Sequence, residues 1–166
     1  DLSHRDLSYA ELRRESEKFA AVLQSLGACP GSRVATLMGK SREYLITLMG
    51  IWRLGAVHVP LFTAFAPPAI ALRLNGSGAV LVVCDAGQRS KLMPGEDIPA
   101  SPGWKVITTG VADDGALSWA SLMADAQPGI AAAVVGGDAP LIHVYTSGTT
   151  GNPKGVIVPA RALAAF

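Results

Sequence analysis

The chain has 166 residues, of which 49% are hydrophobic and 16% are charged, and its formal net charge at pH 7 is +1. This length and apolar content suit one compact domain with a real core and argue against a disordered chain. The two signs of charge are intermixed, which gives no support for nucleic-acid binding or for a basic membrane patch. No apolar run reaches the length of a membrane span.

Local signals divide the chain into alternating helices and strands. Ser8 and Glu11 have the spacing of a capping box, and the residues that follow are apolar at helical intervals. Gly27 suits the end of that helix, and Pro67 suits the first turn of a later one. The β-branched run at 79–84 is typical of a strand covered on both faces. In chain order, helices are predicted at 8–26, 41–54, 67–74, 86–92 and 117–126, and strands at 33–38, 56–59, 79–84, 104–109, 141–145 and 155–158.

This alternation predicts an α/β fold with a largely parallel sheet and flanking helices, built from βαβ units. In such sheets ligands bind beyond the carboxyl ends of the strands. Residues 129–140 carry little signal and read as a linker. Residues 159–166 read as the opening of a helix, from which we expect this chain to be a piece of a longer protein.

A loop rich in glycine and hydroxyl side chains follows the strand predicted at 141–145. Residues 145–155 read Tyr-Thr-Ser-Gly-Thr-Thr-Gly-Asn-Pro-Lys-Gly. Glycines let a phosphate approach the backbone, and successive N–H groups can converge on an anion. Hydroxyl donors and the compact charge of Lys154 suit a polyphosphate. Gly155 follows the lysine where a Walker A motif requires serine or threonine. The alternative is an ordinary surface loop between two strands.

Residues 145–155 match, position by position, the phosphate loop of the adenylate-forming superfamily, which includes acyl-CoA synthetases, luciferases and the adenylation domains of peptide synthetases. Further segments resemble the same superfamily at 9–12, 30–35 and 51–61. Residues 62–67 are similar to the acetyl-, propionyl- and medium-chain branch of the acyl-CoA synthetases. The resemblance therefore covers nearly the whole chain.

The resemblance implies that residues 1–166 are a partial N-terminal AMP-binding domain, the N-terminal portion of the synthetase large domain. The rest of that domain and the C-terminal lid domain would lie beyond Phe166, together with the magnesium-binding glutamate and the lid lysine. No catalytic residue and no metal ligand is therefore assigned within this chain. By the same resemblance the phosphate cradle consists of Thr146, Ser147, Gly148, Thr149, Thr150, Gly151 and Lys154.

The implied reaction joins a short- or medium-chain carboxylic acid to coenzyme A at the expense of ATP, with Mg²⁺, through an acyl-adenylate. An isolated 166-residue chain is not expected to complete it. One departure from the family pattern is Ala160, which stands where a histidine often follows the loop. Three alternatives stay open: a ligase that uses a carrier-protein thiol, a non-catalytic module that binds ATP or AMP, and a scaffold in which the loop is vestigial.

The remaining residues with chemical potential have simpler interpretations. His143 could approach substrate or phosphate, but a buried strand histidine with one satisfied hydrogen bond is favoured. His58, within an apolar strand, is expected to be structural. Cys29 and Cys84 are expected to be buried thiols in a reducing compartment, which with the lack of a visible signal peptide favours the cytoplasm. No oligomeric state is predicted.

Overall fold

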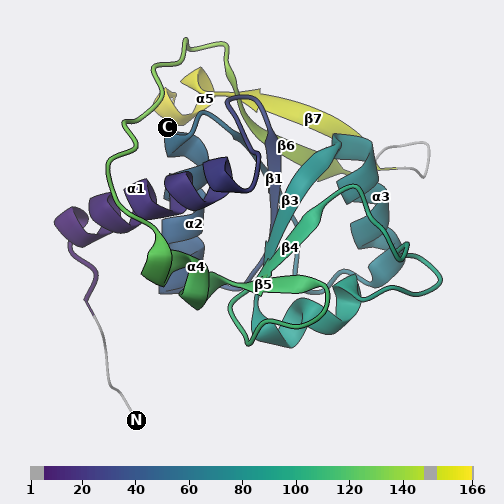
Figure 1. Ribbon diagram of the computed structural model, residues 1–166. Coiled ribbons are helices and arrows are strands. Elements are labelled where there is room, and N and C mark those ends of the chain that lie inside the picture. Colours follow the sequence, from purple (N-terminus) through teal and green to yellow (C-terminus); the bar gives the residue numbers. More distant parts are fainter. Residues whose placement is uncertain (1–5, 148–152, 166) are drawn as a thin grey trace.

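The computed structural model describes residues 6–147 and 153–165. In these residues helices and strands alternate from α1 to β4, and the strands form one sheet in the order β5-β4-β3-β1-β2-β6-β7 (Figure 1). The strands are β1 (Arg33–Leu37), β2 (Val57–Pro60), β3 (Ala79–Cys84), β4 (Lys105–Thr108), β5 (Ala116–Ser118), β6 (Pro140–Thr146) and β7 (Lys154–Pro159). The helices are α1 (Tyr9–Ser25), α2 (Arg42–Arg53), α3 (Pro67–Ser77), the 3₁₀ helix η1 (Ala86–Leu92), α4 (Trp119–Asp125) and α5 (Arg161–Ala164).

All neighbouring strands from β5 to β6 run parallel, and only β7 joins its neighbour antiparallel among the described strands. The predicted α/β fold with a largely parallel sheet is therefore confirmed. Helices α1, α2 and α4 cover one face of the sheet, and α3 lies on the other (Figure 1). Because βαβ crossovers are right-handed, helices on opposite faces carry the chain in opposite directions along the sheet. This explains why β2 and β3 lie on opposite sides of β1.

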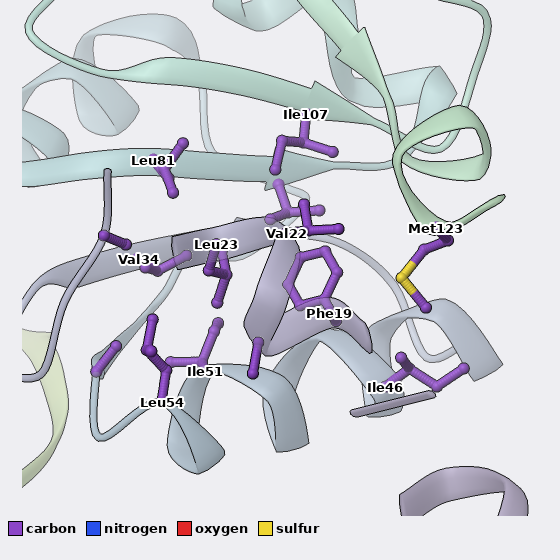
Figure 2. Close-up of a cluster of buried hydrophobic side chains, with 14 of the residues drawn as sticks. Phe19, Val22, Leu23, Val34, Ile46, Ile51, Leu54, Leu81, Ile107 and Met123 are labelled. Carbon is purple, nitrogen blue, oxygen red and sulfur yellow. The ribbon is translucent and has the colours of Figure 1, made fainter. Parts of the chain in front are cut away.

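Each face of the sheet buries its own apolar cluster. On the first face Phe19 of α1, Ile51 of α2 and Leu81 of β3 are fully buried together (Figure 2). Helices α1 and α2 approach so closely that a Cβ on Gly50 would lie 2.8 Å from the Phe19 ring. On the other face, Ile70 of α3 packs in a second cluster with β1, β2, β3 and β4. The predicted coverage of the sheet on both faces is thus observed.

Helix ends follow the predicted local signals at the first helix and depart from them at the third. Ser8 and Glu11 form the predicted capping box, with the Glu11 N–H donating to Ser8 Oγ at 3.2 Å and the Ser8 N–H donating to Glu11 Oε2 at 3.0 Å. The predicted end of α3 near Leu74 was too early, because the helix continues to Ser77. It ends at Gly78, whose φ of +63° is the left-handed conformation that favours glycine.

Two short elements differ from the sequence prediction. β5 occupies the start of the region predicted as helix 117–126, and α4 begins only at Trp119, capped by the hydroxyl of Ser118. β5 exists because it pairs with β4, a tertiary contact that the local pattern does not encode. The short helix predicted at 86–92 is observed over the same residues, as the 3₁₀ helix η1. In the part of the chain that the structure describes, no helix is long and apolar enough to cross a membrane.

The two cysteines have different surroundings. Cys84 is fully buried in β3, and burial raises the pKa of its thiol to about 11. The prediction of burial was wrong for Cys29, which is exposed in the turn after α1 with its sulfur 3.4 Å from Ser32 Oγ. A turn between a helix and a strand runs over the surface, so its apolar neighbours in sequence do not cover the thiol.

His58 is a structural residue, as predicted. Its side chain is 3% exposed, and Nε2 lies 2.8 Å from the hydroxyl of Thr36 on β1. Burial lowers the pKa of His58 from 6.5 to about 4, because the low-dielectric core disfavours the imidazolium. The folded chain therefore holds this histidine neutral at pH values where the unfolded chain protonates it.

We expect the free energy of unfolding to fall as the pH drops from 6.5 towards 4, because only the unfolded state binds the His58 proton in that window. The full contribution is roughly 3 kcal/mol. Urea titrations at several pH values measure it, with His58→Gln as the comparison. If the free energy of unfolding of the variant changed with pH between 6.5 and 4 as steeply as that of the wild type, the assignment to His58 would be contradicted.

Candidate phosphate-binding site

The predicted phosphate loop joins β6 to β7, and the described ends of these strands define its neck. Thr146 pairs with Lys154, and Tyr145 pairs with Gly155, in an antiparallel ladder. Residues directly opposite one another in such a ladder place their side chains on the same face. The Thr146 hydroxyl and the Lys154 ammonium group therefore share one face of the hairpin, and both residues are exposed.

The structure brings together the described part of the predicted cradle. Thr146, Ser147 and Lys154 all lie at the open end of the hairpin and are solvent-exposed. Their hydroxyl donors and one fixed positive charge match the chemistry of a phosphate ligand. The other predicted cradle residues lie outside the described residues: Gly148, Thr149, Thr150 and Gly151.

The loop follows the carboxyl end of β6, as the sequence predicts. β6 lies beside β2, with His58 opposite Ile142, and its last residues extend beyond the end of β2 with β7 as their partner. The hairpin also passes beside α3 (Figure 1). A Cβ on Gly76, in the last turn of α3, would lie 2.7 Å from the Tyr145 hydroxyl oxygen. The sheet edge and α3 together position the loop.

His143 lies on the other face of the hairpin, two residues before Tyr145. It is half-buried rather than buried, and its ring stacks on Tyr145 with centroids 5.0 Å apart and planes 19° apart. Burial lowers the pKa of His143, and the charge of Arg33 lowers it further. A Cβ on Gly155 would overlap Nε2 of His143, so a larger residue at this stem position would displace the imidazole. His143 supports the stem from the side opposite Thr146 and Lys154.

The connection that leads into β6 is fastened to the end of α2. Trp52 Nε1 donates to the carbonyl of Leu141 at 3.2 Å. Arg53 Nη1 donates to the carbonyl of Ile130 at 3.2 Å, and the Arg53 carbonyl accepts from the N–H of Ala133 at 2.8 Å. These roles of Trp52 and Arg53 were not predicted from the sequence. The only local signal is that a half-buried tryptophan N–H usually finds an acceptor.

The described residues offer no cluster of metal-ligating side chains. No group of three His, Cys, Asp or Glu side chains that could hold a metal ion occurs in residues 6–147 and 153–165. A cavity of about 770 Å³ lies at the opposite edge of the sheet, lined by residues that include Trp104 and Leu117. The hydroxyl and ammonium donors at the neck suit an anion.

Fold and site together define a largely parallel α/β protein whose β6–β7 hairpin presents Thr146, Ser147 and Lys154 to solvent. A family model described as AMP-binding enzyme matches residues 2–166. The chain belongs to this family, which confirms the resemblance to the adenylate-forming synthetases.

Similar proteins support the same assignment. The acetyl-coenzyme A synthetase of Chlorobaculum tepidum is 37% identical over 170 residues, covering 93% of this chain and 26% of that protein. An acyl-CoA synthetase of Brucella canis matches with a TM-score of 0.87 and 35% identity over 98% of this chain and 30% of that chain. ATP-bound MatB of Rhodopseudomonas palustris matches with a TM-score of 0.83 and 33% identity over 99% of this chain and 32% of that chain. The chain thus spans about a quarter of the length of the curated synthetase it matches.

Replacing Trp52 by Phe is expected to loosen β6 selectively, because the indole N–H to Leu141 is lost. A lost hydrogen bond of this kind costs on the order of 1 kcal/mol. Hydrogen exchange should rise in residues 140–146 more than in β1 or β3. Trp119→Phe is the matched control, since its Nε1 donates to Thr47 Oγ1 at the same 3.2 Å but does not touch β6. Equal effects of the two variants on β6 would contradict an anchoring role for Trp52.

Proposed function

We propose that this chain is the phosphate-binding portion of an ATP-dependent acid–thiol ligase. The observation that carries the proposal is the pairing of Thr146 with Lys154 at the neck of a glycine- and hydroxyl-rich loop. This pairing presents a hydroxyl and an ammonium group on one exposed face, where they can meet the β- and γ-phosphates of ATP. Membership of the AMP-binding enzyme family supports it.

In the proposed reaction a carboxylate oxygen attacks the α-phosphorus of ATP and pyrophosphate leaves. A thiol sulfur then attacks the acyl carbon of the adenylate, forms the thioester and releases AMP. Negative charge grows on pyrophosphate in the first step, and a fixed ammonium group such as Lys154 stabilises it. Magnesium is expected to accompany ATP, but residues 6–147 and 153–165 offer no carboxylate cluster for it.

The proposed acid is short or medium in chain length, and the proposed thiol is that of coenzyme A. Similarity to an acetyl-coenzyme A synthetase supports both choices. A carrier-protein thiol is the alternative within the same reaction class. The alternative from another class is a module that binds ATP or AMP without catalysis; it would bind nucleotide but would release no pyrophosphate with any acid.

We also propose that residues 1–166 are a partial AMP-binding domain and that the remaining synthetase parts are encoded elsewhere in a longer protein. The isolated chain is then expected to show no ATP–pyrophosphate exchange, because it carries the phosphate loop without the other parts of an active site. Exchange by the purified 166-residue chain with any carboxylic acid would overturn this domain assignment.

Lys154→Ala in the natural protein that contains this chain is expected to lower ATP–pyrophosphate exchange on the order of 100-fold, since one electrostatic partner of the leaving group is removed. A panel of acids from acetate to decanoate would define the substrate in the same assay. Arg14→Ala, which removes an exposed charge on α1, is the control and should leave the rate unchanged. Wild-type exchange by Lys154→Ala would refute the role of the lysine, and no exchange by wild type would favour the non-catalytic module.

A further inference from the structure

Arg73 on α3 is a buried cation. Its side chain is 9% exposed, and Nη1 donates to the carbonyl of Ala69 in the preceding turn at 2.7 Å. In residues 6–147 and 153–165, none of the ion pairs involves Arg73. Burying a charge is costly unless other groups compensate it. Its neighbours must therefore supply that compensation.

Two aromatic rings face the guanidinium group. The Arg73 Cζ atom lies 4.1 Å from the ring centroid of Phe65, in the segment before α3, and 5.8 Å from that of Tyr145 on β6. Both distances lie within the range of cation–π attraction, which strengthens when the groups are withdrawn from water. Burial raises the pKa of Tyr145, and the charge of Arg73 acts in the opposite direction. The cation thus connects the α3 region to the strand that enters the phosphate loop.

From Tyr145 the contacts continue into both stems of that loop. Its ring stacks on His143, and a Cβ on Gly76 of α3 would meet its hydroxyl oxygen. Gly155, which is paired with Tyr145, leaves just enough room for the imidazole of His143. We call the series Phe65, Arg73, Tyr145 and His143 the stem stack. It lies on the face of the hairpin opposite Thr146 and Lys154.

We propose that Arg73 is a positioning residue for the phosphate loop and acts through Tyr145. The stem stack holds one face of the β6–β7 hairpin against α3, so that Thr146 and Lys154 on the other face have a fixed position before the phosphates arrive. A site organised in advance loses less conformational entropy on binding. This inference rests on the proposed function, because it assigns the polyphosphate of ATP to that face.

The first test is the affinity for ATP of the natural protein that contains this chain, measured by calorimetry. Arg73→Met keeps the packing volume and removes the cation, and is expected to weaken ATP binding about tenfold. Tyr145→Leu should lower the affinity for ATP by a similar factor. The double variant should bind ATP no less tightly than the more affected of the two single variants, because both changes break the same contact. Tyr145→Phe keeps the ring and Arg73→Lys keeps the charge, so both should retain most of the affinity.

The second test needs no nucleotide. Hydrogen exchange of the 166-residue chain should accelerate in β6 and β7 in Arg73→Met, with smaller changes in β1 and β3. Arg89→Met is the matched control, because Arg89 is also 9% exposed but pairs with Asp113 at 2.7 Å. Arg89 lies in η1, which precedes β4, and β4 is on the side of the sheet away from β6 and β7. This control should lower the melting temperature and leave both ATP affinity and β6–β7 exchange at wild-type values.

The outcomes separate the two proposals. The positioning role would be overturned if Arg73→Met kept both the wild-type affinity for ATP and the wild-type hydrogen exchange in β6 and β7. It would also be overturned if Arg73→Met and Arg89→Met changed these two quantities equally. Faster β6–β7 exchange in Arg73→Met, combined with no ATP binding by the wild-type protein, would support the stem stack as a local anchor and overturn the proposed function. Tenfold weaker ATP binding with an unchanged melting temperature supports both.

Discussion

The structure depends on the requirement that a parallel sheet be covered on both faces. β1 and β3 have almost no exposed residues, and an apolar cluster lies on each side of them. Because parallel strands need crossover connections, the covering helices are also the segments that determine strand order. Placing α2 and α3 on opposite faces sends β2 and β3 to opposite sides of β1. The same arrangement places α3 where the β6–β7 hairpin later passes.

The hairpin is the point at which this parallel pattern ends. β6 is parallel to β2 and antiparallel to β7. Side chains from two helices also contact this strand. Trp52 of α2 holds its beginning, and Arg73 of α3 contacts Tyr145 near its end. The two faces of the hairpin consequently differ, since one packs on α3 and the other presents Thr146 and Lys154.

Sequence reasoning succeeded where a local signal has one physical meaning. The capping box of Ser8 and Glu11 and the β-branched run of β3 were predicted correctly, because each depends on neighbours within a few residues. It failed for β5, which forms only through its pairing with β4, and for Cys29, whose exposure depends on where the turn lies. His143 was expected to be buried, but the hairpin leaves it half-exposed and stacked on Tyr145.

The sequence by itself determined the α/β class, the order of most elements and the family. It could do so because hydrophobic periodicity and the motif at 145–155 are both carried by residues that are consecutive in the chain. Membership of the AMP-binding enzyme family agrees with that reading. Only the tertiary structure decided which face of the loop stem is free and which is packed. That choice depends on Arg73 and Tyr145, which are 72 positions apart in sequence, and no local pattern records a contact between such distant residues.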